Sequence, residues 1–146
     1  MIITSYDESS KINISTKKEI VNFLHNHLGE YGDDAPAIEK AIDYALKERT
    51  SFGGFVLVAK EEDVIVGATV INKTGMDGYI PENILVYIST HGKYRGQGIG
   101  KGLMKEAIEK CEGNIALHVE PNNPAKYLYE KLGFENKYLE MRLIKN

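Results

Sequence analysis

The sequence contains a single cysteine, Cys111, no tryptophan and only four prolines. One cysteine cannot form a disulfide within the chain or a metal site of several thiolates, so a cytoplasmic location is expected. No apolar run approaches the roughly 18 residues of a membrane-spanning helix. The first ten residues, MIITSYDESS, lack the basic region and the long apolar run of a signal peptide. We therefore expect no membrane partner.

The sequence also lacks a large excess of positive or negative charge. Eighteen Lys and Arg residues face 21 Asp and Glu residues, for a formal net charge of −3, which does not favour nucleic acid as a partner. Apolar residues make up 42% of the chain and charged residues 27%, as in ordinary globular proteins. No internal repeat is present. With 146 residues, the chain is expected to form one domain over residues 1–146.

The first half of the sequence predicts two helices among strands. The alternation in residues 11–14 suits a short edge strand. Thr16 and Glu19 have the spacing of a capping box, and the helix that they begin would end at Gly29. Asp34 would begin a second helix.

The patterns that follow predict a sheet with a glycine-rich segment in its middle. Residues 54–59 and 64–71 have the composition of a β-hairpin, and residues 84–90 that of a buried strand. The remaining expected elements are a helix from Ile99 to near Gly113, a strand over 114–119, a short helix from Ala125 to Leu132, and a last strand over 137–145. Asn123 and Pro124 suit the N-cap and the first helical position of the short helix. This order predicts an α/β (α+β) architecture with about four helices around one central sheet.

The glycine-rich segment YRGQGIGKG covers residues 94–102, between the strand 84–90 and the following helix. Such a turn gathers backbone N–H groups at the positive end of a helix, an arrangement that binds phosphate. Glycines let the backbone approach an anion without a Cβ in the way. A merely flexible turn is the alternative interpretation, but nearby cations favour the first: Lys93, Arg95, Lys101 and Lys105.

Two common phosphate loops do not fit the spacing. A P-loop requires Ser or Thr after Gly-Lys, and Gly102 stands there. A dinucleotide fingerprint requires a third glycine where Lys101 stands. The pattern that fits is Arg95-x-x-Gly98-x-Gly100. A second pattern follows in NNPAKYLYEKLGF, namely Asn122-x-x-Ala125-x-x-x-Tyr129-x-x-x-Gly133-Phe134.

Together, the two patterns resemble the signatures of the Gcn5-related N-acetyltransferases (GNAT). The resemblance covers residues 84–134, and the helix–helix–hairpin order upstream agrees with it. It implies a mostly antiparallel sheet that splays between its two central parallel strands, 84–90 and 114–119. It also implies transfer of an acetyl group from acetyl-coenzyme A to a primary amine by direct attack on the thioester, without a metal.

The resemblance also implies a position for each part of acetyl-coenzyme A. The pyrophosphate would lie on backbone amides of the glycine-rich segment, and the pantetheine arm would pair with strand 84–90. Asn122 would hold the pantetheine amides, although a turn residue is an alternative reading of it. The expected cofactor-binding residues are Ile88, Ser89, Thr90, Arg95, Gly96, Gln97, Gly98, Ile99, Gly100, Lys101 and Asn122.

The reaction needs a donor for the carbonyl oxygen and a proton for the leaving thiolate. A backbone N–H near Ser89 or Thr90 could supply the first. Tyr129 matches the family's tyrosine, which implies a general acid, and a tyrosine that only packs on the sheet is the alternative.

The general base is less defined. The glutamate that many relatives carry on the central strand falls at Val86, which cannot take a proton. Glu82 is our candidate, with Glu120, His118 and a water relay as alternatives. His91 lies nearer the pyrophosphate end and suits the role less.

The acceptor also stays open. The acidic and aromatic segment 29–34 would favour a cationic amine, but such a loop is often just solvated. A small amine, a polyamine, a lysine side chain and a peptide N-terminus are all compatible. The short tail after Phe134 could free an edge strand for a homodimer contact. The alternative function is a coenzyme A-binding sensor or interaction module without turnover.

Overall fold

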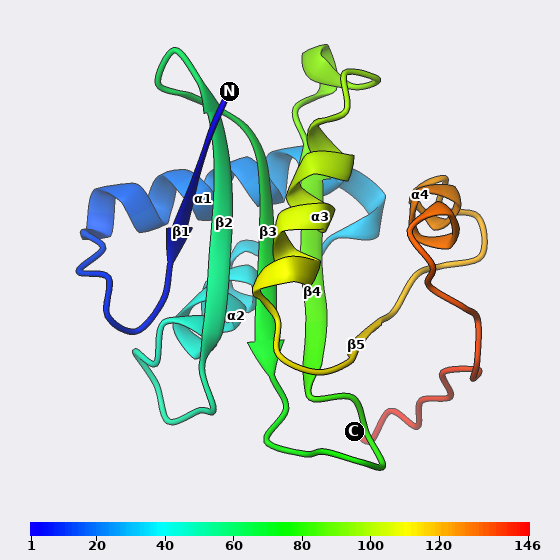
Figure 1. The fold of residues 1–146 in the computed structure, drawn as a ribbon. Coiled ribbons are helices and arrows are strands. Elements are labelled where there is room, and N and C mark those ends of the chain that lie inside the picture. Colours follow the sequence, from blue (N-terminus) through cyan, green and yellow to red (C-terminus); the bar gives the residue numbers. More distant parts are fainter.

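The computed structural model describes all residues from 1 to 146. Its strands form one sheet in the order β1-β2-β3-β4-β5, in which β4 and β5 are parallel and the other neighbours antiparallel (Figure 1). In chain order the elements are β1 (Ile2–Tyr6), α1 (Ile14–Leu28), a 3₁₀ turn (Gly29–Tyr31), α2 (Ala35–Ala45), β2 (Gly54–Glu61), β3 (Val64–Lys73), β4 (Asn83–Thr90), a second 3₁₀ turn (Gly92–Tyr94), α3 (Ile99–Lys110), β5 (Ile115–Leu117) and α4 (Ala125–Lys131).

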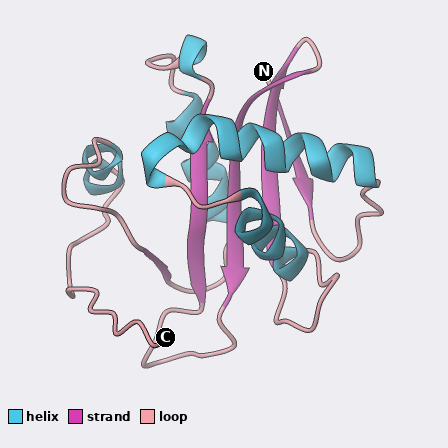
Figure 2. Ribbon diagram, turned by 180° about the vertical axis from the view of Figure 1, so that it is seen from behind, coloured by secondary structure: helices cyan, strands magenta, loops and turns pink.

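Helices cover both faces of the sheet. α1 and α2 lie on one face, and α3 lies on the other (Figures 1 and 2). Ile20 and Leu24 of α1 are fully buried, and they are four residues apart, so they share one side of the helix. Leu103 and Met104 of α3 fill the opposite layer. None of the helices combines the length and apolar composition that crossing a bilayer requires.

The start of α1 corrects two predictions. The Asn13 side chain accepts a hydrogen bond from the Thr16 N–H at 2.7 Å, so Asn13 is the N-cap in place of the predicted capping box. Because the helix begins at Ile14, the predicted strand over 11–14 is wrong. The edge strand is instead β1, which pairs with β2. The second helix begins as predicted, since Asp34 accepts from the Ala37 N–H.

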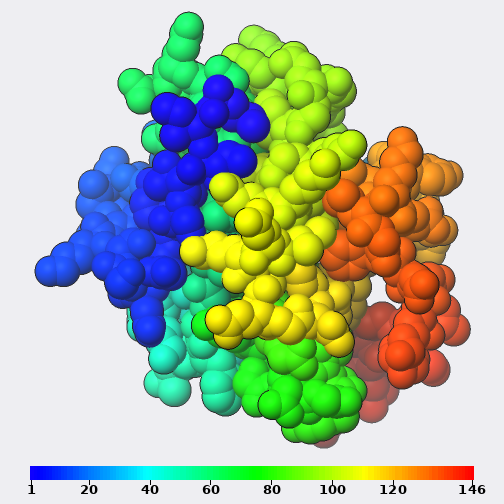
Figure 3. All heavy atoms as spheres, in the orientation of Figure 1, coloured from blue at the N-terminus to red at the C-terminus, as the bar shows by residue number.

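The C-terminal tail corrects a third prediction. Residues 137–145 form no strand, and β5 is shorter than the predicted 114–119. A β-rich sequence needs a partner strand before its backbone can be paired, and the tail has none. Its large apolar side chains are exposed: Tyr138, Leu139, Met141, Leu143 and Ile144. Figure 3 shows α4 and the tail at one side of the molecule, next to α3.

The predicted splay between the two parallel strands is confirmed. β4 and β5 pair only from Asn83↔Ile115 to Leu85↔Leu117, and then separate. On the other side of β4, Val70 pairs with Tyr87 and Ile71 with Leu85, so Val86 is an extra residue in a β-bulge. The bulge and the end of the β4–β5 ladder therefore coincide.

Candidate functional site

The turn after β4 has a backbone that only glycine adopts easily. Gly96 and Gly98 have φ angles of 80° and 81°, in the left-handed region. A Cβ built on either residue would meet no atom within 4 Å. The glycines are therefore needed for the course of the chain, and the space beside them is open to a ligand.

The start of α3 presents unpaired backbone donors. Gly98 is the N-cap and supplies no side-chain hydrogen bond, and the first helical bond joins the Gly102 N–H to the Gly98 carbonyl at 2.9 Å. The N–H groups of Ile99, Gly100 and Lys101 consequently have no partner within the helix. They lie at the positive end of the helix dipole, where anions are stabilised.

The edge of β4 beyond Leu85 is free on the β5 side. The His91 N–H donates to the Val66 carbonyl at 2.8 Å, which fixes the alternation of the antiparallel β3–β4 ladder. By this alternation, the main-chain groups of Ile88 and Thr90 point towards the splay. Those of Ser89 point towards β3, and its hydroxyl donates to the His27 carbonyl at 2.8 Å.

Tyr129 lies on α4 and is only 7% exposed. Its ring packs against Phe134 at 6.0 Å between centroids. Burial alone raises the pKa of Tyr129 to about 12, and no protein group hydrogen-bonds the hydroxyl. The side chain therefore keeps its proton at neutral pH and is free to donate it.

A hydrogen bond joins the α1–α2 connection to the segment before α4. The Tyr31 hydroxyl donates to the Asn122 carbonyl at 3.3 Å. The side chain of Asn122 is exposed. The side chain of Asn123 accepts from the Ala125 N–H at 2.9 Å, but the N-cap of α4 is Pro124, one residue later than predicted. Tyr31 therefore ties the 3₁₀ turn Gly29–Tyr31 to the segment between β5 and α4 that carries Asn122.

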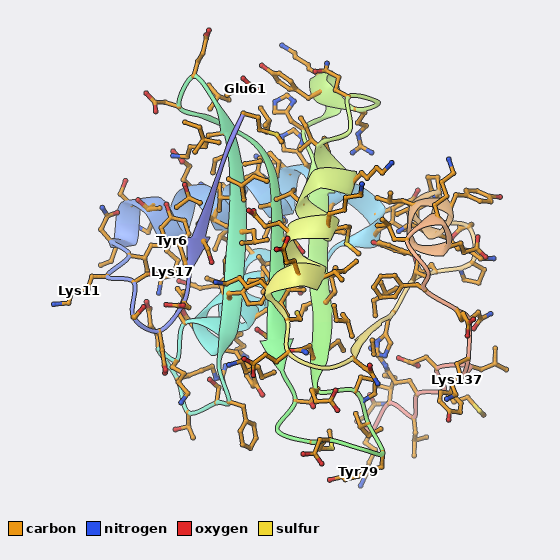
Figure 4. The ribbon with its side chains drawn as sticks, in the orientation of Figure 1. Tyr6, Lys11, Lys17, Glu61, Tyr79 and Lys137 are labelled. Atoms are coloured by element: carbon orange, nitrogen blue, oxygen red, sulfur yellow. The ribbon has the colours of Figure 1, made fainter.

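The structure does not bring Glu82 to the glycine-rich turn. Glu82 precedes β4, at the end of the sheet where the β3–β4 loop with Tyr79 lies (Figure 4), whereas the turn follows β4 at the opposite end. Its carboxylate accepts from the Asn114 N–H at 2.6 Å, and this bond lowers the pKa of Glu82. A hollow of about 470 Å³ lies here, lined in part by Glu82 and Asn83.

Sequence reasoning missed a pair of side chains close to the splay. The Tyr87 hydroxyl donates to a carboxylate oxygen of Asp33 at 2.5 Å. Burial and the neighbouring carboxylate raise the pKa of Tyr87 well above its usual range. A tyrosine in an apolar strand gives no signal of such a partner 54 residues away.

A sequence model of the acetyltransferase (GNAT) domain matches residues 52–136. The chain belongs to this family. A further match links this GNAT chain to the cysteine-rich protein 2-binding protein of mouse and of human, with 33% identity over 57 residues. That match covers 38% of this chain and 7% of the relative, so the chain spans only a small part of the relative's length.

Solved structures share the fold over nearly the whole chain. A transcriptional regulator from Bacillus halodurans C-125 has a TM-score of 0.70 and 21% identity, over 99% of this chain and 100% of that one. A ribosomal-protein-alanine N-acetyltransferase from Brucella melitensis biovar Abortus 2308 has a TM-score of 0.67 and 18% identity, over 100% and 99%. An aminoglycoside N-acetyltransferase in complex with coenzyme A has a TM-score of 0.62 and 16% identity, over 99% of each chain.

Proposed function

We propose that this GNAT domain transfers an acetyl group from acetyl-coenzyme A to a primary amine, with residues 1–146 acting as one unit in the cytoplasm. The observation that carries the proposal is the combination of unpaired amides at the start of α3 with the free edge of β4 next to it. A phosphate group would match the unpaired amides, and an extended chain with amide groups would match the free strand edge. Coenzyme A contains both.

The pyrophosphate would be held by the turn from Arg95 to Lys101. The open space beside Gly96 and Gly98 leaves room for it, and the amides of Ile99 to Lys101, which have no partner within α3, would donate to it. Gln97 and the two cations at the ends of the turn, Arg95 and Lys101, would add polar contacts. The residues present therefore fit a doubly charged phosphate group.

The pantetheine arm would continue along β4 as an added strand. The main-chain groups of Ile88 and Thr90 are the ones directed to the splay, and amide groups of the arm can pair with them. Asn122 lies in the segment between β5 and α4 and is proposed to hold the arm from there. Ser89 would contribute by fixing β4 to α1 through its hydroxyl rather than by touching the arm.

The chemical step joins the amine nitrogen to the carbonyl carbon and breaks the carbon–sulfur bond. The carbonyl oxygen gains negative charge on the way, and a main-chain N–H at the splay, that of Ile88 or Thr90, would stabilise it. Tyr129 is proposed to protonate the departing thiolate. The amine must lose a proton, because a lysine-like amine has a pKa of about 10.4 and attacks only when neutral.

The group that takes this proton is not fixed by the geometry. Glu82 as the general base stays a prediction, and its hydrogen bond to Asn114 at the other end of β4 argues against it. Glu120 lies two residues before Asn122, in the segment that the Tyr31 hydroxyl ties to the α1–α2 connection. Glu120 or a chain of water molecules is therefore the better-placed route.

A second candidate function is a coenzyme A-binding module without turnover. Val86 occupies the position of the base carried by many relatives, and one similar fold belongs to a protein described as a transcriptional regulator. Such a module would bind coenzyme A through the same turn but would not consume acetyl-coenzyme A.

One experiment separates these possibilities. Acetyl-coenzyme A is titrated into the protein by calorimetry, and its consumption is then followed with a panel of amines and peptides, with products read by mass spectrometry. Binding together with an acetylated product supports the proposal. Binding without any product across the panel supports the second candidate, and no binding at millimolar acetyl-coenzyme A overturns both.

A further inference from the structure

Two histidines meet where α1 ends against the glycine-rich turn. The rings of His27 and His91 lie against each other, with their centroids 4.3 Å apart and their planes tilted by 37°. His27 also contacts the Phe23 ring at 4.7 Å, and His91 meets the Tyr94 ring edge-on at 5.5 Å. The four rings form a continuous contact from the buried side of α1 to the segment that leads into the turn.

Hydrogen bonds fasten the same junction. The main-chain carbonyl of His27 accepts from the Ser89 hydroxyl at 2.8 Å and from the Arg95 guanidinium at 3.3 Å. The Nδ1 atom of His91 accepts from the Lys93 N–H at 3.1 Å. One residue of α1 thus holds both the end of β4 and the first residue of the turn.

The junction is adapted to neutral rings. A proton on Nδ1 of His91 would remove the acceptor for the Lys93 N–H. A charged His27 would lie against His91 and near Arg95, while Phe23 and Tyr94 bring no negative charge. Burial, and then the charges of His91 and Arg95, lower the pKa of His27, and no carboxylate opposes them.

The direction of the pH effect follows from this. A histidine whose pKa is lower in the assembled junction than in an opened one binds fewer protons when the junction is formed. The junction therefore has its full stability above the ordinary histidine pKa of about 6.5 and loses it as the pH falls through the lowered value.

We propose that His27 and His91 are positioning residues that hold the glycine-rich turn in its coenzyme A-binding form only while both rings are neutral. Affinity for coenzyme A then falls in mildly acidic solution. The second statement rests on the function proposed above, whereas the first concerns the turn alone and holds or fails without any ligand.

The ligand-free protein tests the first statement. Backbone amide resonances of residues 95–101 are followed by NMR from pH 8.0 to 5.5. In the wild type, they should move together with the His27 ring signals. In His27→Phe, which retains a ring between Phe23 and His91 but cannot be charged there, this movement should be smaller, and in the double variant His27→Phe, His91→Asn it should disappear. The matched control is His25→Gln, an exposed histidine of the same helix, which should behave as the wild type.

Binding measurements test the second statement. Dephospho-coenzyme A is the appropriate probe, because it keeps the pyrophosphate and lacks the phosphate monoester of coenzyme A, whose own second pKa is about 6. Its affinity for the wild type and for His25→Gln should weaken about three- to tenfold between pH 8.0 and 5.5, the range for one linked proton. The ratio of the two affinities should be smaller in His27→Phe, where only His91 can still gain a proton, and in His91→Asn, whose side-chain oxygen can still accept from the Lys93 N–H. It should approach one in the double variant, in which neither ring is left to become charged.

The outcomes separate the inference from the proposed function. Turn amides that ignore the His27 titration, or a His27→Phe protein with the full pH dependence, would overturn the inference. So would tighter binding in acid, because it would mean that charged rings attract the pyrophosphate. If the wild type binds neither coenzyme A nor dephospho-coenzyme A at any pH, the proposed function is wrong. The NMR experiment still tests whether the two histidines hold the turn, because it needs no ligand.

Discussion

At the scale of single residues, Tyr129 combines a buried ring with a hydroxyl that no protein group occupies. Burial favours the neutral form, which raises the pKa to about 12. A proton donor must hold its proton until charge develops on the leaving group, and this side chain does so throughout the neutral and moderately alkaline range. The same burial supplies packing, so the ring and the hydroxyl have separable roles.

Replacement of Tyr129 by Phe separates those roles. The turnover number should fall by roughly 10²–10⁴-fold, the usual contribution of a positioned general acid, while coenzyme A affinity and melting temperature change little. The wild-type rate should rise with pH as the acceptor amine loses its proton. It should show no fall caused by Tyr129 below about pH 12. Steady-state kinetics from pH 6 to 10 provide the measurement, and near-parental turnover would mean that Tyr129 only packs.

Glu82→Gln tests the role first predicted for that carboxylate. A side-chain amide oxygen can still accept from the Asn114 N–H, so local structure should be retained. Because Glu82 lies at the opposite end of β4 from the turn, turnover should stay within about threefold, whereas loss of a positioned base would cost roughly 10²–10⁴-fold. The rate with a neutral-pH amine panel decides between these values, and a drop of the larger size would restore Glu82 as the base.

At the scale of elements, sequence patterns predicted the parts whose signals are local. The two motifs placed the turn before α3 and the start of α4, and periodicity placed α1, α2 and the β2–β3 hairpin. The wrong predictions concern segments whose structure depends on contacts that the local pattern does not show. The alternation over residues 11–14 could not reveal that Asn13 caps the helix, and a β-rich tail could not reveal that no strand lies beside it. The Tyr87–Asp33 bond and the bulge at Val86 also depend on register between segments, which one sequence does not display.

The turn into α3 gives a prediction with a closely matched control. Gly98→Val forces a branched side chain into a left-handed conformation, at a cost of about 1–2 kcal/mol, and also places atoms in the space assigned to the pyrophosphate. Gly78, in the β3–β4 loop, has a φ of 79° and equally empty surroundings. Both Val variants should lose similar thermal stability, but only Gly98→Val should lose coenzyme A binding by calorimetry. Equal binding by the two variants would contradict the assignment of the turn.

At the scale of the whole molecule, the tail is the least covered part of the chain. Leu139, Met141 and Leu143 are 85%, 90% and 85% exposed, and the outer edge of β5 has no neighbouring strand. Exposed apolar segments and open sheet edges are common sites of contact between proteins. The two features together favour the homodimer contact expected from the sequence.

The tail prediction is measured by light scattering coupled to size-exclusion chromatography. The parent chain should have the mass of a dimer at micromolar concentration, and the triple variant Leu139→Lys, Met141→Lys, Leu143→Lys should be a monomer. The control is Ile108→Lys, which places one Lys at an exposed apolar position on α3, outside the tail segment, and this variant should remain a dimer. A monomeric parent would contradict the prediction.

The extra residue at Val86 is expected to lower the stability of the fold and to allow coenzyme A to bind. Without it, β4 would be a regular strand, Tyr87 and Leu85 would keep their present faces, and β5 could stay hydrogen-bonded further along. A chain with Val86 deleted should therefore unfold at a higher denaturant concentration and yet fail to bind coenzyme A, since the gap for the pantetheine arm would have closed. The β-bulge at Val86 would then persist because binding requires it, although it reduces backbone pairing. Selection for stability alone would remove it.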